Sequence, residues 1–480
     1  MTTIETPQTR CLAGIARADI TPPVGIYHRM WGAATHDRAT GVHKPLLATL
    51  LWLEPAGGDE RRSLCIASLD HCILDGPDIE LMERSIADAV AMRPGQTLIT
   101  LSHTHAAGLM SRSRADQPGG ELIGPYLDSL ATRLGQLAVE AIDHRQPATI
   151  VYGRGKCGLA ANRDFFDPQA QKFVCGLNPG GIADDTLLVG RISGADNRVI
   201  GTLVNYACHP TTLAWQNTLI SPDYIGALRE TVESGFHAPC LFLQGASGDL
   251  GPREGYVDDT GVADRNGRQV GFAALAALAT LPPAGSQFVY AGPVVSGATL
   301  GTWRHEPVDA RAADRQKQWH SDTFDLPLDY RPELATKEQT QADLARWQAE
   351  EQKATAAGDS LSARDAHAQV ERMTRQLWRL KSLPAGQFPL RITIAQLGDA
   401  LWVFVPGEHY QNLQTALRQR FPQHPVIVAT LTAGWQPGYI PTADTYGRGI
   451  YQSDIAVVAA GSAERIIDEV GRRIAELIAS

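Results

Sequence analysis

Short apolar runs alternate with longer helical patterns over about the first 300 residues of the chain. The runs have the length and β-branched content of buried strands, and they lie at 46–53, 63–68, 97–101, 149–152, 199–206 and 240–243. Apolar residues at helical spacing occur between some of these runs, at 78–92, 126–143 and 224–234. This alternation predicts an α/β fold built on a mixed sheet.

The segment 332–382 has a different texture. It is rich in Ala, Gln, Glu, Arg and Lys and is interrupted at Gly358-Asp359-Ser360, so we expect two long helices joined by a tight turn, with a solvated charged face. Further strands are expected at 390–395, 402–405 and 426–430, and further helices at 410–419 and after Ser462 as N-cap. The pattern therefore predicts one large domain with a helical-hairpin insertion at 332–382.

Composition narrows the class of protein. The 480 residues carry a net charge of −9 without a Lys/Arg run, which argues against a nucleic-acid partner. No apolar stretch approaches the roughly 18 residues of a membrane span, and the first residues lack the basic and apolar parts of a secretion signal. Seven scattered cysteines without a CxxC pair favour reduced thiols. We expect a cytoplasmic protein without stable membrane insertion. The sequence is also compatible with a homo-oligomer.

Two histidine motifs follow predicted strands. His103 and His105 lie in Leu101-Ser102-His103-Thr104-His105, directly after the run 97–101. In extended backbone, residues two apart point to one face, so both imidazoles can converge at the carboxyl end of the strand. His209 follows the run 199–206 and precedes a proline, which restricts its backbone. For each motif, a hydrogen-bonded histidine without a metal is the alternative.

Three later segments carry further candidates. Glu408, in Pro406-Gly407-Glu408-His409, lies where a strand gives way to a helix, so its carboxylate is either a helix cap or a metal ligand. Tyr439 and Tyr451 lie in a glycine-rich stretch, where aromatic residues usually pack. The segment 244–253 is a glycine-rich turn that lacks the Lys-Ser/Thr of a phosphate-binding loop.

In their order along the chain, these segments resemble the neutral/alkaline ceramidase family. The opening segment 14–22 (GIARADITP) and Gly41-Val42-His43 add to the resemblance, which covers essentially the whole chain. It implies a single neutral-ceramidase-like catalytic domain over 1–480, with a zinc ion held by two histidines, a glutamate and a tyrosine. By motif, the implied zinc ligands are His103, His209, Glu408 and Tyr439. Beside the metal, the family pattern maps catalytic roles onto His105, Arg163 and Tyr451.

Two departures from the family pattern bear on the substrate. Family ceramidases carry a serine, considered catalytic, in a Gly-Asp-Val-Ser-Pro segment, and this chain has Gly251 in its place. Full-length ceramidases also carry a C-terminal sandwich domain, and this chain ends before it. Together with the missing secretion signal, these departures argue against ceramide itself as the substrate.

The resemblance implies a metal-assisted hydrolysis. The implied nitrogen and oxygen ligands suit Zn²⁺, which would lower the pKa of bound water toward ~7 and polarise a carbonyl. His105 would then move protons, while Arg163 and Tyr451 would donate to the developing oxyanion. A surface ion pair with Asp164 or a neighbour is the alternative for Arg163, and simple packing is the alternative for Tyr451.

The preferred interpretation is a zinc-dependent amidase that acts on a small acylated substrate. An esterase or lactonase at the same zinc site is a second hypothesis, because activated water attacks both kinds of carbonyl. A non-catalytic binding protein that retains the fold is a third, and the replacement of the family serine by Gly251 is its only support.

Overall fold

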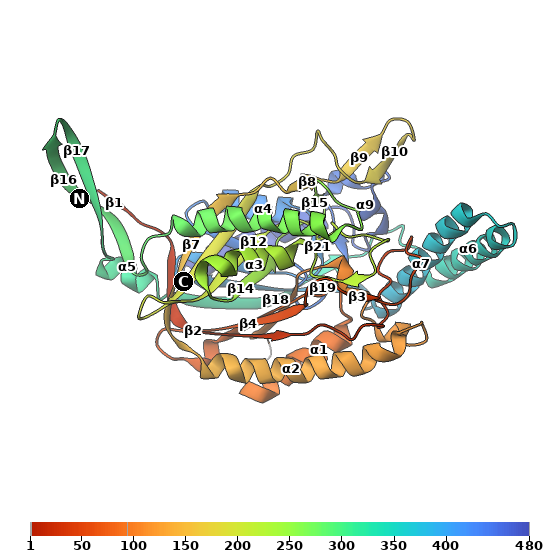
Figure 1. Cartoon of the computed structure of the whole chain (residues 1–480), viewed down its shortest axis with the longest axis horizontal. Coiled ribbons are helices and arrows are strands. Elements are labelled where there is room, and N and C mark those ends of the chain that lie inside the picture. Colours follow the sequence, from red (N-terminus) through yellow and green to blue (C-terminus); the bar gives the residue numbers. More distant parts are fainter. Residues whose placement is uncertain (1, 94, 480) are drawn as a thin grey trace.

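The computed structural model describes residues 2–93 and 95–479, and a large mixed sheet forms its frame (Figure 1). The strand order is β14-β12-β11-β7-β2-β4-β5-β6. The pairs β5/β6 and β12/β14 are parallel and the other pairs are antiparallel. The strands are β2 (Gln8–Asp19), β4 (Leu47–Pro55), β5 (Leu64–Leu69), β6 (Thr97–Leu101), β7 (Gln146–Lys156), β11 (Thr186–Gly194), β12 (Val199–Tyr206) and β14 (Cys240–Gln244).

A second, four-stranded sheet packs against one face of the first. Its order is β18 (Trp319–Asp329), β19 (Gln387–Leu397), β20 (Ala400–Phe404) and β22 (Val426–Ala429), with β20 and β22 parallel. Because side chains alternate along a strand, Leu51 and Leu53 of β4 face inward and pack in one cluster with Trp402 and Phe404. The other face of β4 is equally apolar, so it must be covered as well.

Helices cover the outer faces of both sheets. The large sheet is covered by α1 (Gly76–Val90), α2 (Ile123–Asp143), α3 (Tyr224–Phe236) and α4 (Thr260–Ala279). The smaller sheet is covered by α8 (Asn412–Arg420) and α10 (Ser462–Ala479). The result is an α/β/β/α arrangement in which central strands such as β4, β5 and β20 bury both of their faces, whereas the edge strand β18 exposes one.

Two hairpins project from opposite ends of the molecule (Figure 1). One is helical, α6 (Lys337–Ala356) and α7 (Ser360–Ser382), and each helix has a capping side chain, Thr336 for α6 and Asp359 for α7. The other is the ribbon β16 (Ser286–Ser296) and β17 (Ala298–Pro307), which pairs with β1 (Thr3–Ile4). The sequence predicted the helical hairpin but not the ribbon.

The large sheet curls so strongly that its two parallel pairs approach each other. Ser68 of β5 donates from Oγ to the carbonyl of Phe242 in β14 at 2.7 Å. Just beyond β5, the buried Asp70 pairs with Arg229 of α3. The carboxyl ends of β6 and β12 therefore lie together, although five strands separate them in the strand order.

The expected fold class, α/β with a mixed sheet and a helical-hairpin insertion, is confirmed. Every strand and helix named from the sequence is present, with its boundaries shifted by a few residues, whereas β2, β11, β18 and α4 are among the elements that were not predicted. All seven cysteines are free. Among the described residues, none of the helices has the length and apolar character needed to span a membrane. The interpretation of 1–480 as a single catalytic domain stays a prediction.

Gly14 of β2 is a position where the fold admits no side chain. A Cβ there would lie 1.8 Å from the carbonyl oxygen of Ala141, because α2 packs directly on the strand. We expect Gly14→Ala to lower the free energy of unfolding by about 1–3 kcal/mol, as overpacking does, measured by urea denaturation. Gly158→Ala is the control, since a Cβ there meets no atom within 4 Å. Equal stability of the two variants would contradict this packing.

Candidate active site

His103 and His209 face each other at the point where β6 and β12 end. Their Nε2 atoms are 2.9 Å apart, and both rings are buried. The Nδ1 atom of His103 donates to the carbonyl of Cys72 at 2.8 Å, and that of His209 donates to the carbonyl of Ser247 at 3.1 Å. Because a carbonyl only accepts, each Nδ1 carries the proton, and each Nε2 presents a lone pair to the centre.

The backbone that positions His103 is not the extended strand that the sequence suggested. Strand β6 ends at Leu101, His103 has φ of 69° in the left-handed region, and a 3₁₀ turn, His105–Ala107, follows. The two rings are still neighbours, with centroids 5.0 Å apart. The argument from strand alternation was therefore wrong in its geometry. A strained backbone at His103, of the kind that persists at functional sites, brings the rings together instead.

Glu408 completes the cluster from a different part of the chain. Its Oε2 lies 3.2 Å from Nε2 of His103 and 3.5 Å from Nε2 of His209. It belongs to β21 (Glu408–His409), which pairs in parallel with β23 (Tyr439–Ile440) and places Glu408 directly opposite Tyr439. The alternative of a helix cap does not hold, because α8 begins at Asn412 with Gln411 as its N-cap.

The donor set fits a divalent metal ion. Two imidazole lone pairs and a carboxylate converge within hydrogen-bond distance, and one proton can relieve only one of these contacts. Two ligands held about 2.0–2.1 Å from a tetrahedral zinc ion lie about 3.3 Å apart, close to the three distances here. Burial raises the pKa of Glu408, but His103, Tyr439 and Arg163 bring it below its usual value. The carboxyl is thus held in the ionised form that a metal needs.

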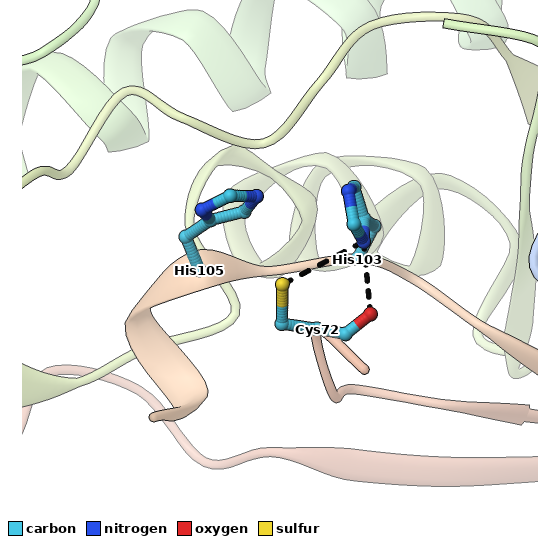
Figure 2. A group of neighbouring side chains, drawn as sticks. All are labelled: Cys72, His103 and His105. Atoms are coloured by element: carbon cyan, nitrogen blue, oxygen red, sulfur yellow. Dashed lines mark hydrogen bonds between the residues drawn. The ribbon is translucent and has the colours of Figure 1, made fainter. Parts of the chain in front are cut away.

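Cys72 offers a second grouping, with His103 and His105. Its Sγ lies 3.6 Å from Nδ1 of His103 (Figure 2), whereas the contacts with His209 and Glu408 are made by Nε2. Since Nδ1 already donates to the carbonyl of Cys72, it is unavailable to a metal. Cys72 therefore orients His103 through its backbone. The sequence analysis missed it, although its place just after β5, the parallel neighbour of β6, was a usable signal.

Arg163 and Tyr439 form the wall beside the cluster. Nη2 of Arg163 donates to Tyr439 Oη at 3.0 Å and to the carbonyl of Gly248 at 2.6 Å. The expected alternative, an ion pair between Arg163 and Asp164, does not form, because Asp164 accepts from other side chains. Burial and Glu408 raise the pKa of Tyr439, whereas Arg163 lowers it. The phenol thus lies between a carboxylate and a guanidinium.

His105 and Tyr451 border the cluster without joining it. The ring of His105 lies 5.0 Å from that of Trp31, and its Nε2 is buried without a hydrogen-bond partner among the described residues. Burial, reinforced by His103 and Arg163, holds the pKa of His105 well below its usual value. Tyr451 is 45% exposed and contacts the ring of Tyr439 edge-on, with centroids 6.0 Å apart. Both side chains are therefore free to face a bound molecule.

A cavity of about 490 Å³ opens onto these residues. Its volume is in the range of small-molecule sites, and most of its walls are apolar. His103, His105, Arg163, Glu408, Tyr439 and Tyr451 line it together with Met30, Trp31, Ile73, Trp215, Tyr256, Arg375, Trp378, Arg379 and Trp435. Sequence reasoning missed the contributions of Trp31 and of α7, because nothing in a helical pattern shows that its base will close a distant cavity.

Gly251 lies in β15 (Leu250–Pro252), close to this wall. A Cβ there would lie 3.8 Å from Arg163 Cδ and 3.9 Å from Thr211 Oγ1, which is ordinary contact. The Oγ1 of Thr211 is buried without a partner among the described residues. A serine would therefore fit where this chain has glycine, and its absence leaves room beside Arg163.

Comparison with known proteins identifies the fold. A scan of protein-family models and a search of curated proteins found no match for this chain. Among solved structures, the neutral ceramidase from Pseudomonas aeruginosa matches at a TM-score of 0.64 and 14% identity, covering 97% of this chain and 74% of the ceramidase. A ceramidase complexed with C2 matches at 0.66 and 14%, covering 98% and 76%.

The mixed-sheet architecture thus belongs to a known class of α/β folds. This chain has the fold of the neutral ceramidases, as the resemblance of its motifs implied.

The cluster predicts about one metal ion per chain, and zinc is the ion that its donors suit best. We expect protein purified without added metal to contain close to one equivalent by elemental analysis. The double variant His103→Ala, His209→Ala removes both lone pairs and should lose the ion. His409→Ala is the control, since its Nε2 bonds to the carbonyl of Pro406 rather than to the cluster. Full zinc occupancy in the double variant would exclude this site.

Proposed function

We propose that this protein is a zinc-dependent hydrolase that cleaves the amide bond of a small acylated substrate. The convergence of His103, His209 and Glu408, with His103 and Glu408 lining the cavity, carries the proposal. Tyr439, paired with Glu408 across β21 and β23, is the fourth proposed ligand. The fold shared with ceramidases, whose name denotes cleavage of an N-acyl lipid, favours an amide as the scissile bond.

When bound, zinc supplies a Lewis acid that activates water and polarises a carbonyl. The side chains around the metal site supply the other catalytic groups. His105 lines the cavity, its Nε2 has no hydrogen-bond partner among the described residues, and it transfers protons between water and the leaving amine. Arg163 is held by Gly248 and Tyr439 and provides a fixed positive charge next to the reacting carbonyl. The exposed phenol of Tyr451 donates a hydrogen bond to the same oxygen.

No protein nucleophile is required by this scheme. Gly251 provides none, and water serves in its place, so the missing serine does not abolish the proposed activity. An esterase or lactonase at the same site remains the second candidate, because the same groups act on an ester carbonyl. A binding protein without turnover is the third. A screen of N-acyl amides and matched esters at saturating zinc separates all three.

His105 is expected to act on the reaction rather than on the metal, because its Nε2 bonds to none of the cluster's atoms. His105→Ala should retain zinc and lower kcat roughly 10²-fold, the usual loss for a proton-transfer group. Steady-state kinetics on the best amide, with metal content measured on the same samples, checks this. Unchanged kcat would remove His105 from the mechanism, and loss of zinc would make it a ligand.

The substrate is expected to be a soluble or moderately amphipathic amide rather than membrane ceramide. The helical hairpin, which borders the cavity, has a mostly polar exposed surface instead of the apolar and basic face of a membrane anchor. We expect kcat/KM for short N-acyl amides to exceed that for detergent-dispersed ceramides at saturating zinc. A clear preference for ceramide would overturn this expectation and leave the proposed zinc site intact.

A further inference from the structure

Helix α7 presents two arginines to the cavity. Arg375, Trp378 and Arg379 share one face of the helix, since residues three and four apart lie above each other. Both arginines also border an adjoining outer pocket of about 530 Å³. They therefore lie where the outer pocket and the cavity of the candidate metal centre meet.

The fold leaves much of their hydrogen-bonding capacity unused. Nη1 of Arg379 donates to Gln376 Oε1 at 2.7 Å and to the carbonyl of Ile455 at 3.2 Å, but its Nε is buried without a partner among the described residues. The buried Nε of Arg375 also lacks a hydrogen bond, and Nη2 donates to the carbonyl of Met30 at 2.7 Å. Buried N–H groups of a guanidinium are costly to leave unpaired, so a bound acceptor would stabilise them.

No carboxylate of the described residues pairs with Arg379, whose guanidinium lies over the ring of Trp435 instead. The nearest acid to Arg375 is Glu371, at 3.6 Å, and both oxygens of Glu371 already accept from Arg114. Glu408 is the one carboxylate among the described cavity-lining residues, against three arginines. Since Glu408 belongs to the metal cluster, the cavity carries an uncompensated positive charge.

We propose that the substrate carries an anionic group, bound by Arg375 and Arg379, and that it is an N-acylated amino acid or a close relative with a carboxylate. This rests on the proposed amidase function and specifies its substrate class. Two guanidinium groups match a carboxylate, which accepts several charge-assisted hydrogen bonds at once. The apolar walls at Trp31, Trp378 and Trp435 take the acyl chain.

The proposed reaction is a simple hydrolysis. Water adds its oxygen to the acyl carbon, the C–N bond breaks, and the nitrogen takes a proton, which gives a carboxylic acid and a free amino acid. No oxidant, reductant or second substrate is needed. The negative charge of the substrate stays on a group that does not react, so the arginines act through binding and orientation.

The test compares N-lauroylglycine with its uncharged analogue N-lauroylglycinamide. We expect wild-type protein to bind and hydrolyse N-lauroylglycine better than N-lauroylglycinamide. Arg379→Gln should lower kcat/KM and affinity for N-lauroylglycine by about 10- to 100-fold, the usual range for a charge-assisted contact, and leave those for N-lauroylglycinamide unchanged. Arg379→Lys should retain part of the preference. Arg364→Gln, an exposed arginine on the same helix, should change nothing. Thermal unfolding of each variant monitors folding.

The outcomes separate this inference from the amidase itself. Calorimetry can show a binding preference for N-lauroylglycine that Arg379→Gln removes. If neither compound is hydrolysed in that case, the anion site is supported and the amidase proposal is overturned. Hydrolysis of both compounds at equal kcat/KM overturns the anion site and leaves the amidase. A preference for N-lauroylglycine that neither Arg379→Gln nor Arg375→Gln alters would place the carboxylate elsewhere, and the inference would be wrong.

Discussion

The site depends on the contact between Nε2 of His103 and Nε2 of His209, which lie 2.9 Å apart. Each ring is oriented by a hydrogen bond from its Nδ1 to a backbone carbonyl. Two lone pairs and a carboxylate at such distances repel one another unless a cation lies between them. A fold that holds His103 in a left-handed conformation to maintain this approach stores strain at one residue. A metal ion bound at the candidate site would offset that strain, and ion binding would then be coupled to local stability.

The curl of the large sheet makes this contact feasible. His103 and His209 follow strands with five others between them, and only the closure marked by the contact from Ser68 to Phe242 brings these strand ends together. The remaining donors come from a separate ladder, in which Glu408 and Tyr439 are opposite partners. Gly248 lies beneath that ladder, where a Cβ would lie 2.8 Å from the carbonyl of Glu408. Close backbone packing thus explains the glycine at position 248.

The sequence predicted the parts of this site better than their arrangement. Periodicity located strand 97–101 and the helical hairpin, because burial and helical spacing are local properties. The resemblance of motifs selected residues that the structure brings together: His103, Glu408 and Tyr439 line one cavity, and His209 lies against His103 and Glu408. It could not supply the left-handed turn at His103 or the role of the Cys72 carbonyl, because backbone geometry and backbone acceptors leave no trace in residue type.

The helical hairpin α6–α7 is the clearest example of a segment whose role could not be predicted from its local sequence. Its charges are typical of a solvated face. Over α6 they do form such a face, since Thr340 is the one buried residue of that helix. Near the C-terminal end of α7 the charged residues are not all solvated, because Arg375 and Arg379 line a cavity whose other walls come from distant parts of the chain. The candidate metal ligands lie outside the insertion, whereas the two arginines proposed to bind the substrate belong to it. Since an insertion can change without disturbing the sheets, the proposed hydrolytic centre and its proposed substrate preference could vary independently in this fold.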